Sequence, residues 1–173
     1  HAECGVMLPI LSNLLVKHSF KGGEWLIGIP GTVGGAIYMN AGSGKFTISQ
    51  KLLSIKAINT KTLEIVEINK KDLYFKYRQS SFQSNNLIII SAKFHFQHSE
   101  NKKLISKKTK LTLKFRTESQ PYHLPSFGSV FMNPDKLYAG KLIEEIGLKG
   151  YKNGGAEISK LHANFIINSS NAT

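Results

Sequence analysis

The sequence predicts a mixed α+β protein that is divided into two lobes. Apolar residues recur at helical spacing near residues 8–15 and 139–146, and strand-like apolar segments lie between residues 52 and 97. At 173 residues, with 41% hydrophobic and 20% charged residues, the chain can bury a core. We expect the lobes to divide near residues 97–115, and we assign residues 1–100 to a first domain and 101–173 to a second.

The first domain is predicted to begin with a short helix and to continue into strands. Leucines at positions 8, 11, 14 and 15 have helical spacing, and Pro9 is tolerated in a first turn. Residues 52–59 (LLSIKAIN) and 64–69 (EIVEIN) flank the polar turn TKTL, which is typical of a β-hairpin. Residues 87–97 (LIIISAKFHFQ) predict a further strand, mostly buried.

The second domain is predicted to contain two helices and a terminal strand. Residues 102–116 hold seven positive charges interleaved with apolar residues, which favours a helix with a solvated basic face. Residues 121–134 are punctuated by proline and predict an irregular loop. Asp135–Leu148 has the clearest apolar stripe and predicts a helix that ends near its two glycines. Residues 156–168 predict a loop followed by a buried strand.

The net charge of +12 raises the possibility of a nucleic-acid partner. Only two of the 23 basic residues are arginines, however, and no helix-turn-helix, zinc-finger or RNA-recognition pattern is present. We therefore expect no nucleic-acid partner, although the positive charge can attract small anions.

The chain shows no apolar run of the roughly 20 residues that span a bilayer and no signal-peptide pattern. We expect no membrane insertion and a cytoplasmic location. The single cysteine, Cys4, excludes an intrachain disulfide and is interpreted as a packing residue. No cluster of residues has metal-ligand spacing, so no metal is expected.

The segment Gly28–Gly42 (GIPGTVGGAIYMNAG) is rich in glycine and nearly free of charge. Eight of the chain's 15 glycines lie between residues 22 and 44. Glycine is costly to order, so such a run needs a geometric reason. Two interpretations remain open from the residues alone: a tight structural turn, or consecutive backbone N–H groups that cradle an anion such as a diphosphate. The spacing matches neither the Rossmann nor the Walker pattern.

This segment resembles the flavin-binding signature of the UDP-N-acetylenolpyruvoylglucosamine reductase family, also called UDP-N-acetylmuramate dehydrogenase. Three further segments resemble motifs of that family in the same order: YRQSSF (77–82), RTESQPYHLPSFGSVFMNP (116–134) and AGKLIEEIGLKGYKNGGAEISKLHANFIIN (139–168). The resemblance covers essentially the whole chain. The run after Gly42 departs from the family's pattern. No tyrosine-bearing insertion is recognisable after Phe82, and this absence favours the shorter, second-type branch of the family.

The resemblance implies the second lobe of a vanillyl-alcohol-oxidase-type FAD-binding domain, followed by an α+β substrate-binding domain. It implies FAD and NADPH as cofactors and the reduction of UDP-N-acetylglucosamine enolpyruvate to UDP-N-acetylmuramate in peptidoglycan precursor synthesis, by a monomer. The family's first flavin lobe and its C-terminal catalytic glutamate have no counterpart in this sequence. We therefore expect a fragment that binds FAD weakly and is inactive alone.

The resemblance also implies roles for individual residues. Arg78 and Ser129 are the expected catalytic residues, Arg78 as a cation toward a carboxylate or enolate and Ser129 as proton donor. Tyr77 and Asn133, with Arg78 and Ser129, are expected to contact the substrate, and Lys141 and His162 are weaker candidates. The residues expected to bind FAD are Gly28, Ile29, Pro30, Gly31, Thr32, Val33, Gly34, Gly35, Asn40 and Gly42. The alternatives are another FAD oxidoreductase of the same superfold, or a basic nucleic-acid-binding module.

Overall fold

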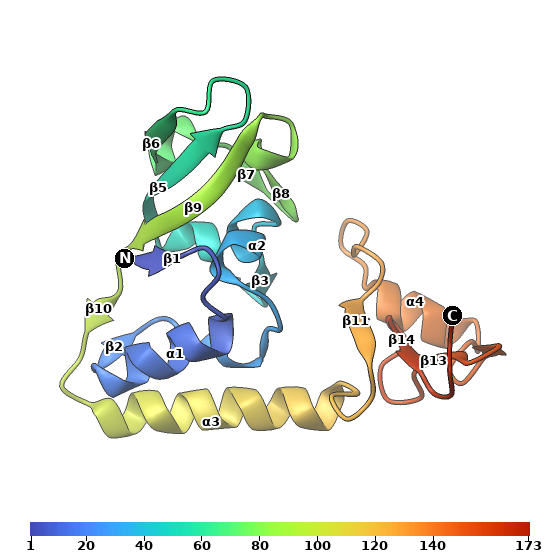
Figure 1. The fold of residues 1–173 in the computed structure, drawn as a ribbon. Coiled ribbons are helices and arrows are strands. Elements are labelled where there is room, and N and C mark those ends of the chain that lie inside the picture. Colours follow the sequence, from blue (N-terminus) through green and yellow to red (C-terminus); the bar gives the residue numbers. More distant parts are fainter. The chain divides into compact units, whose positions relative to one another are not determined.

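The computed structural model describes residues 1–173 and divides them into two compact units (Figure 1). Unit 1 comprises His1–Leu113 and unit 2 comprises Lys114–Thr173. The boundary falls within the long helix α3 (Lys102–Ser119). None of the helices is both long enough and apolar enough to cross a membrane.

Unit 1 is built on an antiparallel four-stranded sheet with the order β1-β9-β5-β6. The central strands β5 (Leu52–Asn59) and β9 (Leu87–Phe94) pair along most of their lengths. The edge strands are β1 (Ala2–Glu3) and β6 (Ile65–Asn69). Both predicted strands of the hairpin and the strand near residue 90 are confirmed.

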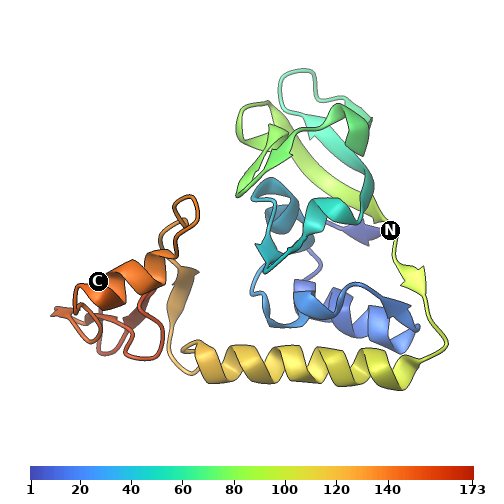
Figure 2. The same cartoon turned by 180° about the vertical axis from the view of Figure 1, so that it is seen from behind.

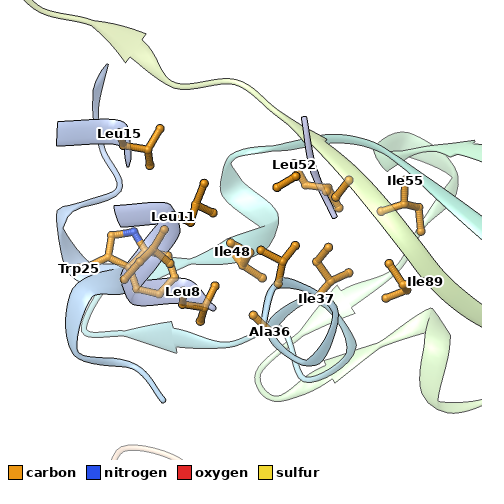
Figure 3. Packing of buried hydrophobic residues seen from close by; sticks show 14 of the residues in the cluster. Leu8, Leu11, Leu15, Trp25, Ala36, Ile37, Ile48, Leu52, Ile55 and Ile89 are labelled. Carbon is orange, nitrogen blue, oxygen red and sulfur yellow. The ribbon is translucent and has the colours of Figure 1, made fainter. Parts of the chain in front are cut away.

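The core of unit 1 lies between this sheet and two helices, α1 (Leu8–Lys17) and α2 (Val33–Tyr38). Figure 3 shows side chains of α1 and Trp25 on one side, those of β5 and β9 on the other, and those of α2 between them. The opening helix was correctly predicted from leucine spacing, and Leu8, Leu11 and Leu15 are its buried leucines. Burial of one such side chain stabilises a fold by about 1.5–3 kcal/mol.

Short elements connect these parts of unit 1, and Figure 2 shows the same chain from behind. There are three two-stranded sheets: β2 (Phe20–Lys21) with β10 (Gln97–His98), β3 (Gly42–Ser43) with β4 (Phe46–Thr47), and β7 (Phe75–Lys76) with β8 (Gln79–Ser80). The 3₁₀ turns are η1 (Glu24–Gly28), η2 (Ile48–Gln50), η3 (Lys70–Asp72) and η4 (Ser81–Gln83).

Unit 2 contains a second antiparallel sheet, with the order β11-β14-β13-β12, and the helix α4 (Ala139–Glu145). The strands are β11 (Ser126–Ser129), β12 (Lys152–Asn153), β13 (Ala156–Ile158) and β14 (Phe165–Asn168). The predicted terminal strand is confirmed. Two predicted loops were wrong in part, because the segment 121–134 contains β11 and the segment before the terminal strand contains β13.

The helix predicted over Asp135–Leu148 is shorter than expected. Lys136 adopts a φ of 58°, and the Leu137 N–H donates to the Pro134 carbonyl at 3.2 Å, so a turn replaces the first helical residues. The helix ends before Gly147, whose φ of 75° suits a left-handed C-terminal residue.

The basic helix was predicted correctly in place and type, but most of its apolar side chains are not buried. Only Ile105 and Thr109 of α3 are buried. Leu104, Leu111 and Phe115 are exposed, because their spacing puts them on another side of the helix from the packed residues.

Candidate functional site

The glycine segment runs through η1, an extended stretch and α2. Gly28 and Val33 are buried, so the Val33 side chain is part of the core, whereas Pro30 and Gly35 are exposed. Thr32 precedes α2, and its hydroxyl accepts a hydrogen bond from the Gly35 N–H at 3.3 Å.

Two of the glycines are required by close packing within the chain. A Cβ on Gly34 would lie 3.0 Å from the Cys4 Cβ, and a Cβ on Gly42 would lie 2.4 Å from the Phe46 carbonyl oxygen. Cys4 is therefore a packing residue, as expected. The structural interpretation of the glycines is correct for these two positions.

Two other glycines leave space that no part of the chain fills. Gly31 has a φ of 136°, which other residues rarely adopt, and nothing lies within 4 Å of where its Cβ would be. At Gly35 the nearest atom to that position is the Thr32 hydroxyl at 3.6 Å. These two positions let another molecule approach the backbone closely.

At the start of α2, the backbone N–H groups that the anion-cradle interpretation needs already have acceptors within the chain. The N–H of Val33 donates to the Val6 carbonyl at 2.9 Å, and that of Gly34 donates to the Cys4 carbonyl at 2.9 Å. Gly35 N–H is bound to Thr32, as described above. The Val33 and Gly34 donors hold the start of α2 against the turn at residues 4–6, and the Gly35 donor caps α2, so none of the three is free to bind an anion.

Asn40 is the buried polar residue at the end of this segment. It is 4% exposed and adopts a φ of 42°. Its amide nitrogen donates to the Lys76 carbonyl at 2.8 Å, but its Oδ1 has no hydrogen-bond partner in the chain. A buried acceptor without a donor costs free energy, so this oxygen is suited to a ligand that carries an N–H or O–H group.

Arg78 lies directly beside the glycine segment. Its guanidinium donates to the Gly42 carbonyl at 3.1 Å and to the Asn40 carbonyl at 3.5 Å, and it lies 5.0 Å from the centre of the Tyr77 ring. Tyr77 and Arg78 form the two-residue turn between β7 and β8. The structure thus brings together the expected catalytic arginine and the end of the expected flavin segment.

The backbone of Arg78 has an unfavourable conformation for a non-glycine residue. Its φ is 55°, at the second central position of the turn, where glycine or asparagine is normally preferred. Such a conformation costs roughly 1–2 kcal/mol in a residue with a Cβ. The two hydrogen bonds from its guanidinium to the Asn40 and Gly42 carbonyls help to hold this conformation.

Because of this conformation, we expect glycine at position 78 to give a more stable protein than alanine, the reverse of the usual order. Arg78→Gly and Arg78→Ala both remove the guanidinium, but only Arg78→Gly removes the Cβ that opposes a positive φ. We expect the glycine variant to be more stable, by about 1 kcal/mol in the free energy of unfolding. Urea unfolding of both variants checks this. Equal stabilities, or a more stable alanine variant, would mean that the turn changes conformation when the guanidinium is lost.

Sequence reasoning gave no role to Ser80, a buried residue that links the same two segments. Its hydroxyl donates to the Tyr38 carbonyl, the last residue of α2, at 2.6 Å. It also accepts from the Phe82 N–H at 3.3 Å. The YRQSSF motif contained this serine, but its partner lies 42 residues away in sequence.

Unit 2 has its own pocket, with a volume of about 350 Å³. It contains Ser129 and Asn133 together with both weaker candidates from the sequence. The remaining lining comes from α4, the residue before it and the loop before β14. The lining residues are Ser129, Asn133, Tyr138, Gly140, Lys141, Glu144, Leu161, His162, Ala163 and Asn164.

Ser129 is the last residue of β11, where the strand pairing is irregular. Ser126 pairs with Ile167 and Ser129 with Phe165, and the register shifts between these two pairs. Gly128, with a φ of 77°, makes this irregularity possible. Such bulges change the direction of a side chain, here the exposed Ser129 beside the pocket.

Asn133 and Lys141 both make local contacts. The Asn133 Oδ1 accepts from the Ala139 N–H at 3.0 Å, so it caps the first residue of α4. Lys141 pairs with Glu145 one turn later at 3.6 Å, and both side chains are exposed. A helix surface pair of this kind contributes only a few tenths of a kcal/mol (roughly 0.3–0.5).

His162 is half-buried at the pocket. Its Nδ1 accepts the Asn164 N–H at 3.2 Å, which fixes the neutral ring with its proton on Nε2. Burial lowers the pKa of His162, and the positive charge of Lys149 lowers it further. The ring also packs edge-on against Phe165, with ring centres 4.8 Å apart. It is a packed histidine and at the same time a pocket residue.

The lowered pKa of His162 predicts that unit 2 loses stability in mild acid. Below the ordinary histidine pKa of about 6.5, the unfolded chain binds a proton that the folded ring resists, so stability falls as pH decreases. The new proton on Nδ1 would also displace the bond from Asn164. Urea unfolding at pH 7.5 and pH 5.5 measures this, with His162→Gln as the control. The prediction fails if the variant loses as much stability as the wild type.

The fold places the chain in a class of mixed α/β proteins for which a crystal structure has been solved. The crystal structure of UDP-N-acetylenolpyruvylglucosamine reductase (MurB) from Thermus caldophilus matches with a TM-score of 0.89 and 32% sequence identity, over 98% of this chain and 61% of that one. A family model described as UDP-N-acetylenolpyruvoylglucosamine reductase, C-terminal domain, matches residues 120–173.

Curated relatives agree with this match along nearly the whole chain. A protein named UDP-N-acetylenolpyruvoylglucosamine reductase from Prochlorococcus marinus subsp. pastoris is 60% identical over 97% of this chain and 57% of its own length. One of the same name from Synechococcus sp. RCC307 is 44% identical over 99% of this chain and 56% of its own length. The chain belongs to the UDP-N-acetylenolpyruvoylglucosamine reductase family. It spans little more than half the length of these relatives.

Proposed function

We propose that this chain contributes the second flavin lobe and the substrate-binding domain of an FAD-dependent reductase. The reductase would use NADPH to convert UDP-N-acetylglucosamine enolpyruvate to UDP-N-acetylmuramate in peptidoglycan precursor synthesis. The observation that carries this proposal is the contact of Arg78 with the glycine segment, in a chain of this family. The flavin role is proposed for unit 1, which also contributes Tyr77 and Arg78 as substrate contacts, and the other substrate contacts are proposed for unit 2.

The residues of the glycine segment fit a flavin in two respects. The open faces at Gly31 and Gly35 allow the flat part of a cofactor to lie against the backbone. The unpaired Asn40 Oδ1 is an acceptor that suits a ring N–H group. FAD, when bound, supplies the transfer of a hydride from NADPH to the substrate. The chain itself holds and orients the cofactor.

Arg78 provides the positive charge that the reaction needs. Addition of a hydride to the β-carbon of the enolpyruvyl group leaves negative charge on the α-carbon and its carboxylate. A guanidinium stays protonated and can donate two parallel bonds to a carboxylate or enolate oxygen. The two carbonyl bonds described above hold the guanidinium in place before substrate arrives, which is favourable for stabilising charge in a transition state.

Ser129 provides the proton that completes the reduction. Its hydroxyl would donate to the α-carbon, and the alkoxide that remains would need donors or cations nearby. The neutral His162 carries a proton on Nε2, and Lys141 carries a positive charge, and both line the same pocket. Tyr77 beside Arg78, and Asn133 beside the pocket, are the proposed substrate contacts.

The test uses the full-length protein. It should purify with a flavin absorbance band, and it should oxidise NADPH only when UDP-N-acetylglucosamine enolpyruvate is added. Flavin binding without this dependence would indicate another flavin oxidoreductase of the same fold. Binding of duplex DNA that weakens steeply with salt, without flavin, would indicate a basic binding module instead.

A further inference from the structure

We propose that Asn164 is a positioning residue that holds the segment carrying Ser129 against β14. This inference rests on the proposed function, because it concerns the residue that would donate the proton.

The Asn164 side chain binds both backbone groups of Phe131, two residues after Ser129. Its Oδ1 accepts from the Phe131 N–H at 2.9 Å, and its Nδ2 donates to the Phe131 carbonyl at 2.8 Å. The Asn164 backbone carbonyl also accepts from the Val130 N–H at 2.9 Å. The amide thus continues the pairing of β11 with β14 beyond the point where the strand ends at Ser129.

The segment after Ser129 has little else to hold it. Val130, Phe131 and Met132 are 42%, 57% and 55% exposed, so their side chains contribute little buried area. Because hydrophobic stabilisation scales with buried area, the hydrogen bonds to Asn164 are the main restraint on this segment. Without them, the pairing of Ser129 with Phe165 would be left as the last contact at the end of β11, and the position of the Ser129 side chain would be less well fixed.

Asn164 is itself well anchored. It is 4% exposed, and its backbone N–H donates to the His162 ring. Phe165, the next residue, begins β14 and is buried. Gly140 on α4 allows this close packing, because a Cβ there would lie 3.2 Å from the His162 ring and 3.5 Å from the Asn164 Cβ. A fixed anchor can hold an exposed strand end in one geometry.

The decisive variant is Asn164→Asp in the full-length protein. An aspartate has the same size and keeps the acceptor for the Phe131 N–H, but it places a carboxylate oxygen against the Phe131 carbonyl. Asn164→Ala removes both bonds without adding a charge, and it decides the question if the aspartate variant fails to fold. The matched control is Asn168→Asp, at the other end of β14, where an exposed Oδ1 accepts from the Ala172 N–H.

Two measurements are made on each variant. Hydrogen exchange at the Val130 and Phe131 amides should become faster in the Asn164 variants and stay unchanged in Asn168→Asp. Reduction of the flavin by NADPH should be normal in all variants. Substrate-driven reoxidation should slow by roughly 10- to 100-fold in the Asn164 variants, the size expected when a reacting group is misplaced.

The outcomes separate this inference from the proposed function. If the wild type does not turn over substrate, the proposed function is wrong, and hydrogen exchange still tests the contact. If the wild type is active but the Asn164 variants reoxidise at its rate, Asn164 does not position Ser129. Equal slowing of both half-reactions would also overturn the inference, because it would show a general structural role.

Discussion

Ser129→Ala in the full-length protein is expected to leave reduction by NADPH nearly unchanged and to slow substrate-driven reoxidation by about 10²- to 10⁴-fold. In the proposed reaction NADPH reduces the flavin before the enol ether reacts, so a proton donor to the substrate has no part in that first step. The second step needs a proton at the carbon next to the hydride, and loss of a general acid typically costs this much. Stopped-flow absorbance in the flavin band measures both rates.

The control for this variant is Ser170→Ala, which removes the hydroxyl of an exposed serine in the same unit. It should match the wild type in both steps. If Ser129→Ala slows both steps by the same factor, Ser129 shapes the site and does not donate the proton. If it slows neither, the role carried over from the family is wrong for this residue.

Arg78→Lys is expected to lose activity almost as severely as Arg78→Ala, by roughly 10²- to 10³-fold in kcat. A lysine keeps the charge but not the planar fork, so it cannot donate to the Gly42 and Asn40 carbonyls and still present two parallel donors to a carboxylate. Steady-state NADPH oxidation with the enolpyruvyl substrate measures the loss.

The second arginine of the chain provides the matched control. Arg116→Lys, on α3 and not among the residues that line the pocket of unit 2, should retain wild-type activity. An active Arg78→Lys variant would reduce the role of Arg78 to that of a general positive charge. Bound flavin should be measured in each variant, since loss of FAD would also abolish turnover.

The fold was predictable where apolar residues recurred at a clear spacing and where residues typical of turns or helix ends marked the ends of the element. The leucines of α1 and the alternation of β5 and β6 satisfied both conditions. The helix at 135–148 did not, because Lys136 closes a turn through its backbone conformation, which residue type does not reveal. Strand β11 was missed since its pairing is irregular and most of its side chains are exposed.

The candidate site was predictable only as a set of motifs. The order of the motifs identified Arg78 and Ser129, and the structure adds that Arg78 is bound to the glycine segment and that Ser129 lines a pocket with Asn133 and His162. Ser80 and Asn164 could not be assigned from spacing. Each acts on backbone groups tens of residues away, and such partners become neighbours only after folding.

The left-handed turn at Arg78 has a consequence for how this sequence can change. Selection for thermal stability alone favours glycine or asparagine at this position, because these two residues adopt a positive φ at the lowest cost. The proposed catalytic role of Arg78 would make selection for turnover favour the arginine. The two pressures therefore oppose each other at one residue, and a library sorted first for stability and then for catalysis should recover different sequences at position 78 in the two rounds.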